Sequence, residues 1–268
     1  MKALEENNIS IDFISGTSSG SIVAILYAIG YNYEEIYELF KKYSKKIKYF
    51  DFKNIIKLIF GILIKRKIII NGLNSGKIIE DLIDEYCVKK EIKNIKEIKM
   101  PLIIPSVDLH TGKIYFFSSK INRNKISDEI IYCNNIEIGK AVRASCSYPV
   151  VFSPCKYNNT ELIDGGIREN IPWKETKKMG ADKVISIVFE KEYDGKCCKN
   201  LIEVVKDSMS LLNHELANYE LKEADYLLKI KTKNIGLLDM EKIDELFKLG
   251  YNTAMKNIRE IKEVININ

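Results

Sequence analysis

The sequence predicts an α/β fold, a three-layer α/β/α sandwich around a mostly parallel central sheet. Two observations support this prediction. Short apolar runs typical of buried strands alternate along the chain with segments whose apolar residues recur at helical spacing. The composition, with 46% hydrophobic and 29% charged residues in a chain of 268, is that of a globular protein that can bury a sizeable core.

The expected elements follow one another in order along the chain. Apolar runs bounded by turn residues predict strands at Ile9–Ile14, Pro101–Val107, Ile114–Ser118, Val184–Val188 and Tyr226–Lys231. Apolar residues at helical spacing predict helices at Ser21–Ile29, Glu34–Tyr43, Ser75–Tyr86, Pro172–Met179, Leu201–Leu221 and Met240–Val264. Between the second and third strands, Gly112 is expected to supply the positive φ angle of a hairpin turn.

A pentapeptide of the form Gly-x-Ser-x-Gly, Gly16-Thr17-Ser18-Ser19-Gly20, stands between the first expected strand and the first expected helix. In a nucleophile elbow this pattern makes a turn so sharp that the serine is strained above a helix N-terminus, which favours negative charge. A Cβ at Gly16 or at Gly20 is expected to collide with the strand or helix. The pattern predicts Ser18 as a nucleophile and the Ser19 N–H as an oxyanion donor, and an ordinary β–α turn is the alternative.

Asp164 is the best partner for such a serine. It ends an apolar run and precedes Gly165 and Gly166, whose missing side chains let a carboxylate approach another loop closely. The chain has only two histidines. His110 is expected in the hairpin turn, and His214 lies inside a helical segment. A triad of Ser18, Asp164 and His214 matches the motif order of α/β-hydrolases and stays an alternative, although a mid-helix histidine suits it poorly.

These residues together resemble the motifs of the patatin-like phospholipases. In that family Gly-x-Ser-x-Gly supplies the nucleophile and Asp-Gly-Gly the aspartate of a Ser-Asp dyad that needs no histidine, which implies these roles for Ser18 and Asp164. Further segments also resemble the family: Lys140–Pro154, Asn170–Pro172 and Met179–Asp182. The resemblance implies a patatin-like core at 1–182 and strands and helices at 183–268 that pack on the same sheet. It also implies hydrolysis of lipid esters through an acyl-enzyme, with no metal or organic cofactor.

The sequence departs from the family pattern before the elbow. The family's glycine-rich oxyanion loop, of the form G-G-G-x-R-G, lies upstream of the nucleophile, and no glycine precedes Gly16 here. Met1–Ile9 resembles the last turns of the helix that follows that loop. We therefore expect the first strand, the oxyanion loop and half a helix to be missing, which would weaken catalysis. An inactive lipid-binding protein is one alternative, and a thioesterase or protein-directed hydrolase with the same dyad is another.

The stretch from Lys41 to Ile70 mixes basic residues with apolar and aromatic ones. A basic, apolar, amphipathic element is typical of peripheral membrane contact, since apolar burial and attraction to anionic headgroups act together. A helix packed on the core, with its lysines in water, is the alternative. Nucleic-acid binding is not expected, because the net charge of +5 is modest and no stacking motif accompanies the lysines.

The remaining signals predict a cytoplasmic protein. No stretch reaches the roughly 20 apolar residues that a membrane span needs, and we expect no signal peptide. The six cysteines form no C-x-x-C pair and no cluster with histidine, so neither a zinc site nor a disulfide framework is expected. The cysteines are expected to be reduced thiols.

Overall fold

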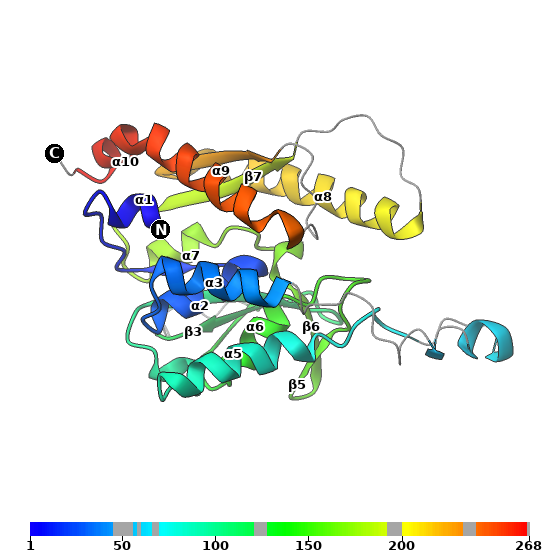
Figure 1. The fold of residues 1–268 in the computed structure, drawn as a ribbon. Helices are drawn as coiled ribbons and strands as arrows, with labels where there is room; N and C mark the ends of the chain where they lie inside the picture. The colour runs from blue at the N-terminus through cyan, green and yellow to red at the C-terminus, as the bar shows by residue number, and fades with distance from the viewer. Residues whose placement is uncertain are drawn as a thin grey trace. The chain divides into compact units, whose positions relative to one another are not determined.

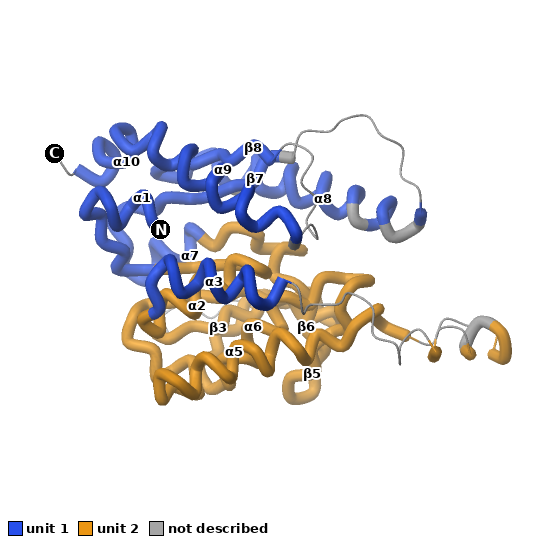
Figure 2. Tube along the Cα trace, viewed as in Figure 1, with its two compact units in different colours: residues 1–13, 31–45, 173–268 blue, residues 14–30, 46–172 orange. Residues whose placement is uncertain are grey.

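The computed structural model describes residues 1–44, 56–57, 60–65, 70–120, 128–191, 200–232 and 240–266 (Figure 1). The chain divides into two compact units, which Figure 2 shows in blue and orange. The first unit comprises residues 1–13, 31–45 and 173–268, and the second comprises residues 14–30 and 46–172. Both predicted motifs, at 16–20 and 164–166, fall in the second unit.

A mixed sheet forms the centre of the second unit. Its strands are β1 (Ile14–Ser15), β2 (Leu102–Asp108), β3 (Ile114–Ser118), β4 (Ile130–Cys133), β5 (Cys155–Tyr157) and β6 (Thr160–Asp164). They lie in the order β4-β3-β2-β6-β5, and β1 also pairs with β2. The β1–β2 and β3–β4 pairs are parallel, whereas β2–β3, β2–β6 and β5–β6 are antiparallel. Every residue of β2 is buried, as a central strand requires.

Helices cover this sheet. The second unit contains α2 (Ser19–Ala28), α5 (Lys77–Lys89) and α6 (Ile138–Ser145), with short helical turns at Gly61–Lys65, Ile95–Glu97 and Gly165–Ile167. Helices α2 and α6 contact β2 and each other, and α5 contacts α6. Side chains such as Ile25, Phe116 and Ile138 are fully buried in the resulting core. The α/β fold class predicted from the sequence is therefore confirmed.

The first unit is built around a pair of parallel strands. These are β7 (Ile185–Lys191) and β8 (Tyr226–Thr232). Its helices are α1 (Lys2–Glu5), α3 (Tyr33–Ser44), α7 (Trp173–Lys178), α8 (Leu201–Glu220), α9 (Ile243–Lys256) and α10 (Ile258–Val264), with turns at Leu221–Glu223 and Met240–Lys242. Helix α9 contacts β8, α1 and α3. Ala3, Leu228 and Ala254 form a small buried cluster among these elements.

The sheet differs from the sequence prediction in two respects. It is mixed rather than mostly parallel, because β6 and β5 join it beside the expected hairpin of β2 and β3, and β6 runs antiparallel to both β2 and β5. The first expected strand, Ile9–Ile14, shrinks to Ile14–Ser15, because β1 pairs with β2 only at Leu102 and Ile103. The short elements β4, α6 and β5 were not predicted, and β6 was expected only as an apolar run that ends at Asp164.

Much of the basic stretch from 41 to 70 lies outside the described residues. In its described part, the side chains of Ile56, Phe60, Leu63 and Ile64 are exposed, Leu63 to 74%. None of the helices in the described residues is both long enough and apolar enough to cross a membrane.

Candidate active site

The two predicted motifs, at 16–20 and 164–166, lie at the ends of two strands that both pair with β2. Strand β3 takes one edge of β2, and β1 and β6 share the other edge. They run along it in opposite directions, so β1 ends with Ser15 opposite Ile103 and β6 ends with Asp164 opposite Ser106. Only two residues of β2 separate these ends. The turns that follow β1 and β6 must therefore leave the sheet at neighbouring points.

The turn after β1 has the geometry of a nucleophile elbow. Ser18 has φ 53° and ψ −126°, a sparsely populated conformation for a residue with a side chain, which costs roughly 1–3 kcal/mol. Helix α2 begins immediately afterwards at Ser19. The N–H groups of that first turn lack intrahelical acceptors and carry the positive end of the helix dipole. The predicted order of strand, sharp turn and helix is present.

The two outer glycines of this motif are not equivalent. A Cβ added at Gly16 would lie 2.2 Å from the carbonyl oxygen of Gly20, so any side chain there would collide with the backbone. A Cβ added at Gly20 would meet no atom of the described residues within 4 Å. The prediction that both glycines prevent a collision is therefore wrong for Gly20, where a side chain would find open space.

Asp164 is buried where the turn after β6 begins. Its side chain caps the following helical turn, with Oδ1 accepting a hydrogen bond of 2.8 Å from the Gly166 N–H. A Cβ at Gly165 would lie 2.4 Å from the carbonyl oxygen of Pro105 in β2, so the glycine allows this turn to press against the sheet. The Asp-Gly-Gly sequence thus places a carboxylate beside the central strand.

The ionisation of Asp164 is strongly perturbed. Burial raises the pKa of this carboxyl group to about 6, while the Ser18 hydroxyl and the Gly166 N–H act in the opposite direction. Ser18 is near enough to lower this pKa, yet within the described residues no hydrogen bond of normal geometry reaches Oδ2. Ser18 and Asp164 are therefore close but not hydrogen-bonded. Catalytic hydrogen bonds are often long before substrate binds.

The end of α6 holds both motifs. The Ser18 N–H donates to the Ser145 hydroxyl oxygen at 3.1 Å, and the Asp164 N–H donates to the Ser147 carbonyl at 3.1 Å. A third contact joins the two turns, since the Thr17 hydroxyl donates to the Glu169 carbonyl at 3.1 Å. Sequence reasoning assigned no role to Ser145 or Ser147, although both lie in a segment that resembles the family.

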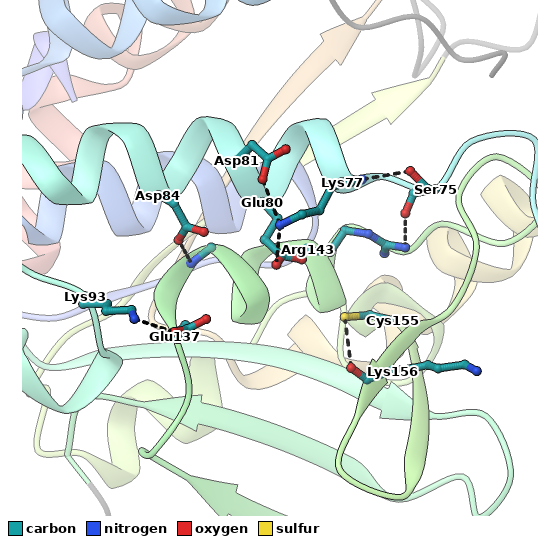
Figure 3. Close-up of polar contacts among 11 residues, drawn as sticks. Ser75, Lys77, Glu80, Asp81, Asp84, Lys93, Glu137, Arg143, Cys155 and Lys156 are labelled. Atoms are coloured by element: carbon teal, nitrogen blue, oxygen red, sulfur yellow. Dashed lines mark hydrogen bonds and ion pairs between the residues drawn. The ribbon is translucent and has the colours of Figure 1, made fainter. Parts of the chain in front are cut away.

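Arg143 anchors this end of α6. Its buried guanidinium donates to the Ser147 hydroxyl and to the carbonyls of Ser75 and Ser153. Figure 3 shows the side chain reaching from α6 to Ser75, just before α5. Burial lowers the pKa of Arg143. The arginine therefore ties the α6 end to two other segments of the second unit.

Neither histidine lies in the turn that holds Ser18 or in the one that follows Asp164. His110 lies in the predicted hairpin turn, where Gly112 has a φ of 72° as expected. The exposed His110 ring has its Nε2 3.2 Å from a carboxylate oxygen of Glu161. Glu161 precedes Asp164 by three residues on β6, roughly 10 Å along the strand. His214 lies in the middle of α8, in the first unit.

The described residues contain no group of three or more metal-binding side chains that could hold an ion. Cys87, Cys133, Cys146 and Cys155 are free thiols, and Cys197 and Cys198 lie outside the described residues. Burial raises the pKa of the Cys146 thiol to about 12, so this group is a thiol and not a thiolate at neutral pH.

Known proteins resemble this chain over much of its length. Lysophospholipase NTE1 of Meyerozyma guilliermondii is 25% identical over 283 residues, which cover 93% of this chain and 17% of that protein. Probable lipid hydrolase 463L of Invertebrate iridescent virus 6 is 30% identical over 179 residues, 63% of this chain and 56% of that protein. The crystal structure of VipD from Legionella pneumophila has a TM-score of 0.49 at 15% identity, covering 97% of this chain and 63% of VipD.

The chain thus spans less than a fifth of the length of the NTE1 protein that it matches. The family model for patatin-like phospholipases matches residues 1–177. This match covers more than half of the chain and includes both Ser18 and Asp164. The chain therefore belongs to the patatin-like phospholipase family.

Proposed function

We propose that this chain is a serine acyl hydrolase that cleaves carboxylic esters of lipids, with Ser18 as nucleophile and Asp164 as proton acceptor. One observation carries the proposal: β1 and β6 end opposite Ile103 and Ser106 of the same strand, so the strained turn of Ser18 and the buried carboxylate of Asp164 follow neighbouring points of the sheet. Membership of the patatin-like phospholipases supports the choice of lipid esters. The names of the relatives, a lysophospholipase and a probable lipid hydrolase, agree with it.

The proposed reaction proceeds in two halves. The Ser18 oxygen attacks the ester carbonyl carbon while Asp164 takes the hydroxyl proton, and the carbonyl oxygen becomes an oxyanion beside the Ser19 N–H. The tetrahedral intermediate expels the alcohol, which receives the proton from Asp164, and leaves an acyl-enzyme. Asp164 then takes a proton from water, which attacks the acyl-enzyme, and the fatty acid leaves as Ser18 regains its proton.

The environment of Asp164 suits it to this role. An aspartate in water is a weak base, with an ordinary pKa near 3.8. Burial raises the pKa of Asp164 to about 6, which makes the carboxylate a stronger base and still leaves it mostly ionised at pH 7. A carboxylate whose pKa is close to 7 can accept the Ser18 proton itself, so the reaction needs no histidine.

Substitution of the two residues tests the proposal. Wild-type protein should hydrolyse a short-chain ester and react with a fluorophosphonate probe at Ser18. Ser18→Ala should abolish both activities, because no other nucleophile is held in the elbow. Asp164→Asn should lower ester hydrolysis by several orders of magnitude, because the amide cannot accept the proton. Steady-state hydrolysis and mass spectrometry of the labelled peptide provide the measurements.

The histidines provide the controls. His110→Ala and His214→Ala should retain activity near that of the wild type. A large loss in the His214 variant, with folding intact, would replace the dyad with a Ser-His-Asp triad. Absence of hydrolysis in the wild type, combined with binding to lipid vesicles, would instead assign the chain a lipid-binding role.

We also propose that the protein acts in the cytoplasm and contacts membranes through part of residues 41–70. Among the described residues of this stretch, four large apolar side chains are exposed: Ile56, Phe60, Leu63 and Ile64. They lie beside the exposed Lys57 and Lys65. Exposed apolar groups next to lysines favour an anionic lipid surface over a packed core.

A further inference from the structure

Ser145 is the last residue of α6 and is completely buried. Its hydroxyl oxygen accepts the backbone N–H of Ser18 at 3.1 Å, across 127 positions of sequence. We propose that Ser145 is a positioning residue that holds the nucleophile in its strained conformation. This inference rests on the proposed function of Ser18.

The contacts around Ser18 show why this hydrogen bond matters. The carbonyl of Ser18 accepts from the Ser21 N–H and from the Ser21 hydroxyl, both within the same turn. The bond to Ser145 is different, because it fixes the N–H of Ser18 to another element. A residue with φ 53° stays in that conformation only where its surroundings determine it. With its N–H and its carbonyl both held, the Ser18 backbone keeps its φ and ψ angles, and these set the direction in which the Cβ leaves the turn.

The same end of α6 also fixes Asp164. The Asp164 N–H donates to the Ser147 carbonyl, two residues beyond Ser145. Ser145 and Ser147 therefore bind the backbone of the nucleophile and of the base, respectively. Because these two serines are only two residues apart, few rotatable backbone bonds lie between the two anchoring points. Arg143 makes this segment stiff, since it donates to the Ser147 hydroxyl, which in turn donates to the Arg143 carbonyl at 2.9 Å.

Ser119 offers a matched control in the same unit. It is buried like Ser145, and its hydroxyl oxygen also accepts a backbone N–H, that of Leu102, at 2.9 Å. Ser119→Ala and Ser145→Ala each leave a backbone N–H without its acceptor, and Ser119→Ala also removes a donor to the Met100 carbonyl, so it should reduce stability at least as much as Ser145→Ala. Only Ser145→Ala removes a hydrogen bond that Ser18 makes.

The experiment compares three variants with the wild type: Ser145→Ala, Ser145→Cys and Ser119→Ala. We expect Ser145→Ala to lower kcat on a soluble ester roughly 10- to 100-fold, because misplacement of a reacting group by about 1 Å has effects of that size. KM should stay within about twofold. Ser145→Cys fills almost the same space but accepts a hydrogen bond weakly, so its kcat should also fall. Ser119→Ala should keep its kcat.

Hydrogen exchange at the Ser18 amide gives a readout that does not depend on activity. This amide should exchange faster in Ser145→Ala than in the wild type or in Ser119→Ala. Unchanged exchange at Ser18 would overturn the inference even in an inactive protein, and equal losses of kcat in the Ser145 and Ser119 variants would reduce Ser145 to a structural role. A wild type that neither hydrolyses esters nor reacts with the probe would refute the proposed function instead.

Discussion

At the scale of single residues, burial changes the pH at which Asp164 ionises. Its pKa rises from about 3.8 to about 6, so the folded protein binds this proton more tightly than the unfolded chain does. The stabilisation from the neutral form is complete below pH 3.8 and is lost as the pH rises through 6. The same titration creates the base, so ester hydrolysis should increase through this pH range as stability falls.

Asp164→Asn separates these effects, because an amide does not titrate. Relative to the wild type, the variant should gain stability between pH 4 and pH 7, by about 3 kcal/mol, as a shift of about two pKa units implies. Urea unfolding at several pH values measures the difference. Curves for the two proteins that stay parallel across this range would show that Asp164 is not perturbed.

Asp108, on the neighbouring strand β2, serves as a control because its pKa is shifted in the opposite direction. Burial raises the pKa of its carboxyl group, but hydrogen bonds from the Thr111 hydroxyl and the His110 backbone outweigh burial, and the net pKa is lowered. Its stabilising contribution is present above pH 3.8 and is lost as the pH falls. Asp108→Asn should therefore lose stability relative to the wild type as the pH rises.

At the scale of elements, the elbow depends on close approach of its own backbone. Gly16 faces the Gly20 carbonyl oxygen at a distance that no Cβ tolerates, whereas Gly20 lies in the first turn of α2 with open space around its Cα. Strand β1 also contributes little pairing, since it contacts β2 at only two positions. The turn is therefore maintained by its own contacts and by α6 more than by the sheet.

Alanine substitutions should distinguish the structural roles of Gly16 and Gly20. Gly16→Ala should lower the thermal midpoint and remove probe labelling at Ser18, because the turn must open to admit the methyl group. Gly20→Ala should be neutral or stabilising by up to about 1 kcal/mol, since alanine is the better helix former. Calorimetry and labelling of both variants give the comparison. Equal damage at both positions would show that the elbow differs from this geometry.

At the scale of the whole molecule, the family match and the compact units do not coincide. Residues 1–177 match the family, and this range includes the whole second unit together with residues 1–13, 31–45 and 173–177 of the first. The candidate site needs only residues of the second unit. The proposed membrane contact involves that unit as well, through the exposed apolar residues near Lys65.

Vesicle binding tests that contact. The protein should bind anionic vesicles more tightly than neutral ones, and salt should weaken the preference. Lys65→Gln should weaken anionic binding about fivefold, since one lysine near such a surface contributes on the order of 1 kcal/mol. Leu63→Ser should weaken binding to both vesicle types, through lost apolar burial.

Val88→Ser provides the matched control, because Val88 is also exposed, to 73%, but lies on α5 outside the basic stretch. It should bind vesicles as the wild type does. Equal binding of the wild type to anionic and neutral vesicles at low salt would contradict the proposed contact and leave residues 41–70 as a packed helix with its lysines in water.

Several features could be predicted because their chemistry is local. The Gly-x-Ser-x-Gly pattern at the junction of strand and helix predicted the sharp turn at Ser18, and Gly112 predicted the hairpin turn that holds His110. The mixed sheet was missed because β5 and β6, which pair antiparallel, were not among the expected strands. The difference between Gly16 and Gly20 was missed because the sequence pattern contains both glycines equally. In the structure only Gly16 lies too close to other backbone atoms to carry a side chain.

The sequence by itself determined the family, the α/β class and the two candidate residues, Ser18 and Asp164. Only the tertiary structure decided how they meet: β2 receives β1 and β6 on one edge, and α6 binds the backbone of both turns. It also decided the pKa of Asp164, which follows from burial. The physical reason is that these interactions join residues from 17 positions apart, Ser147 and Asp164, to 127 positions apart, Ser18 and Ser145, whereas helical and strand periodicity extends over only a few neighbours.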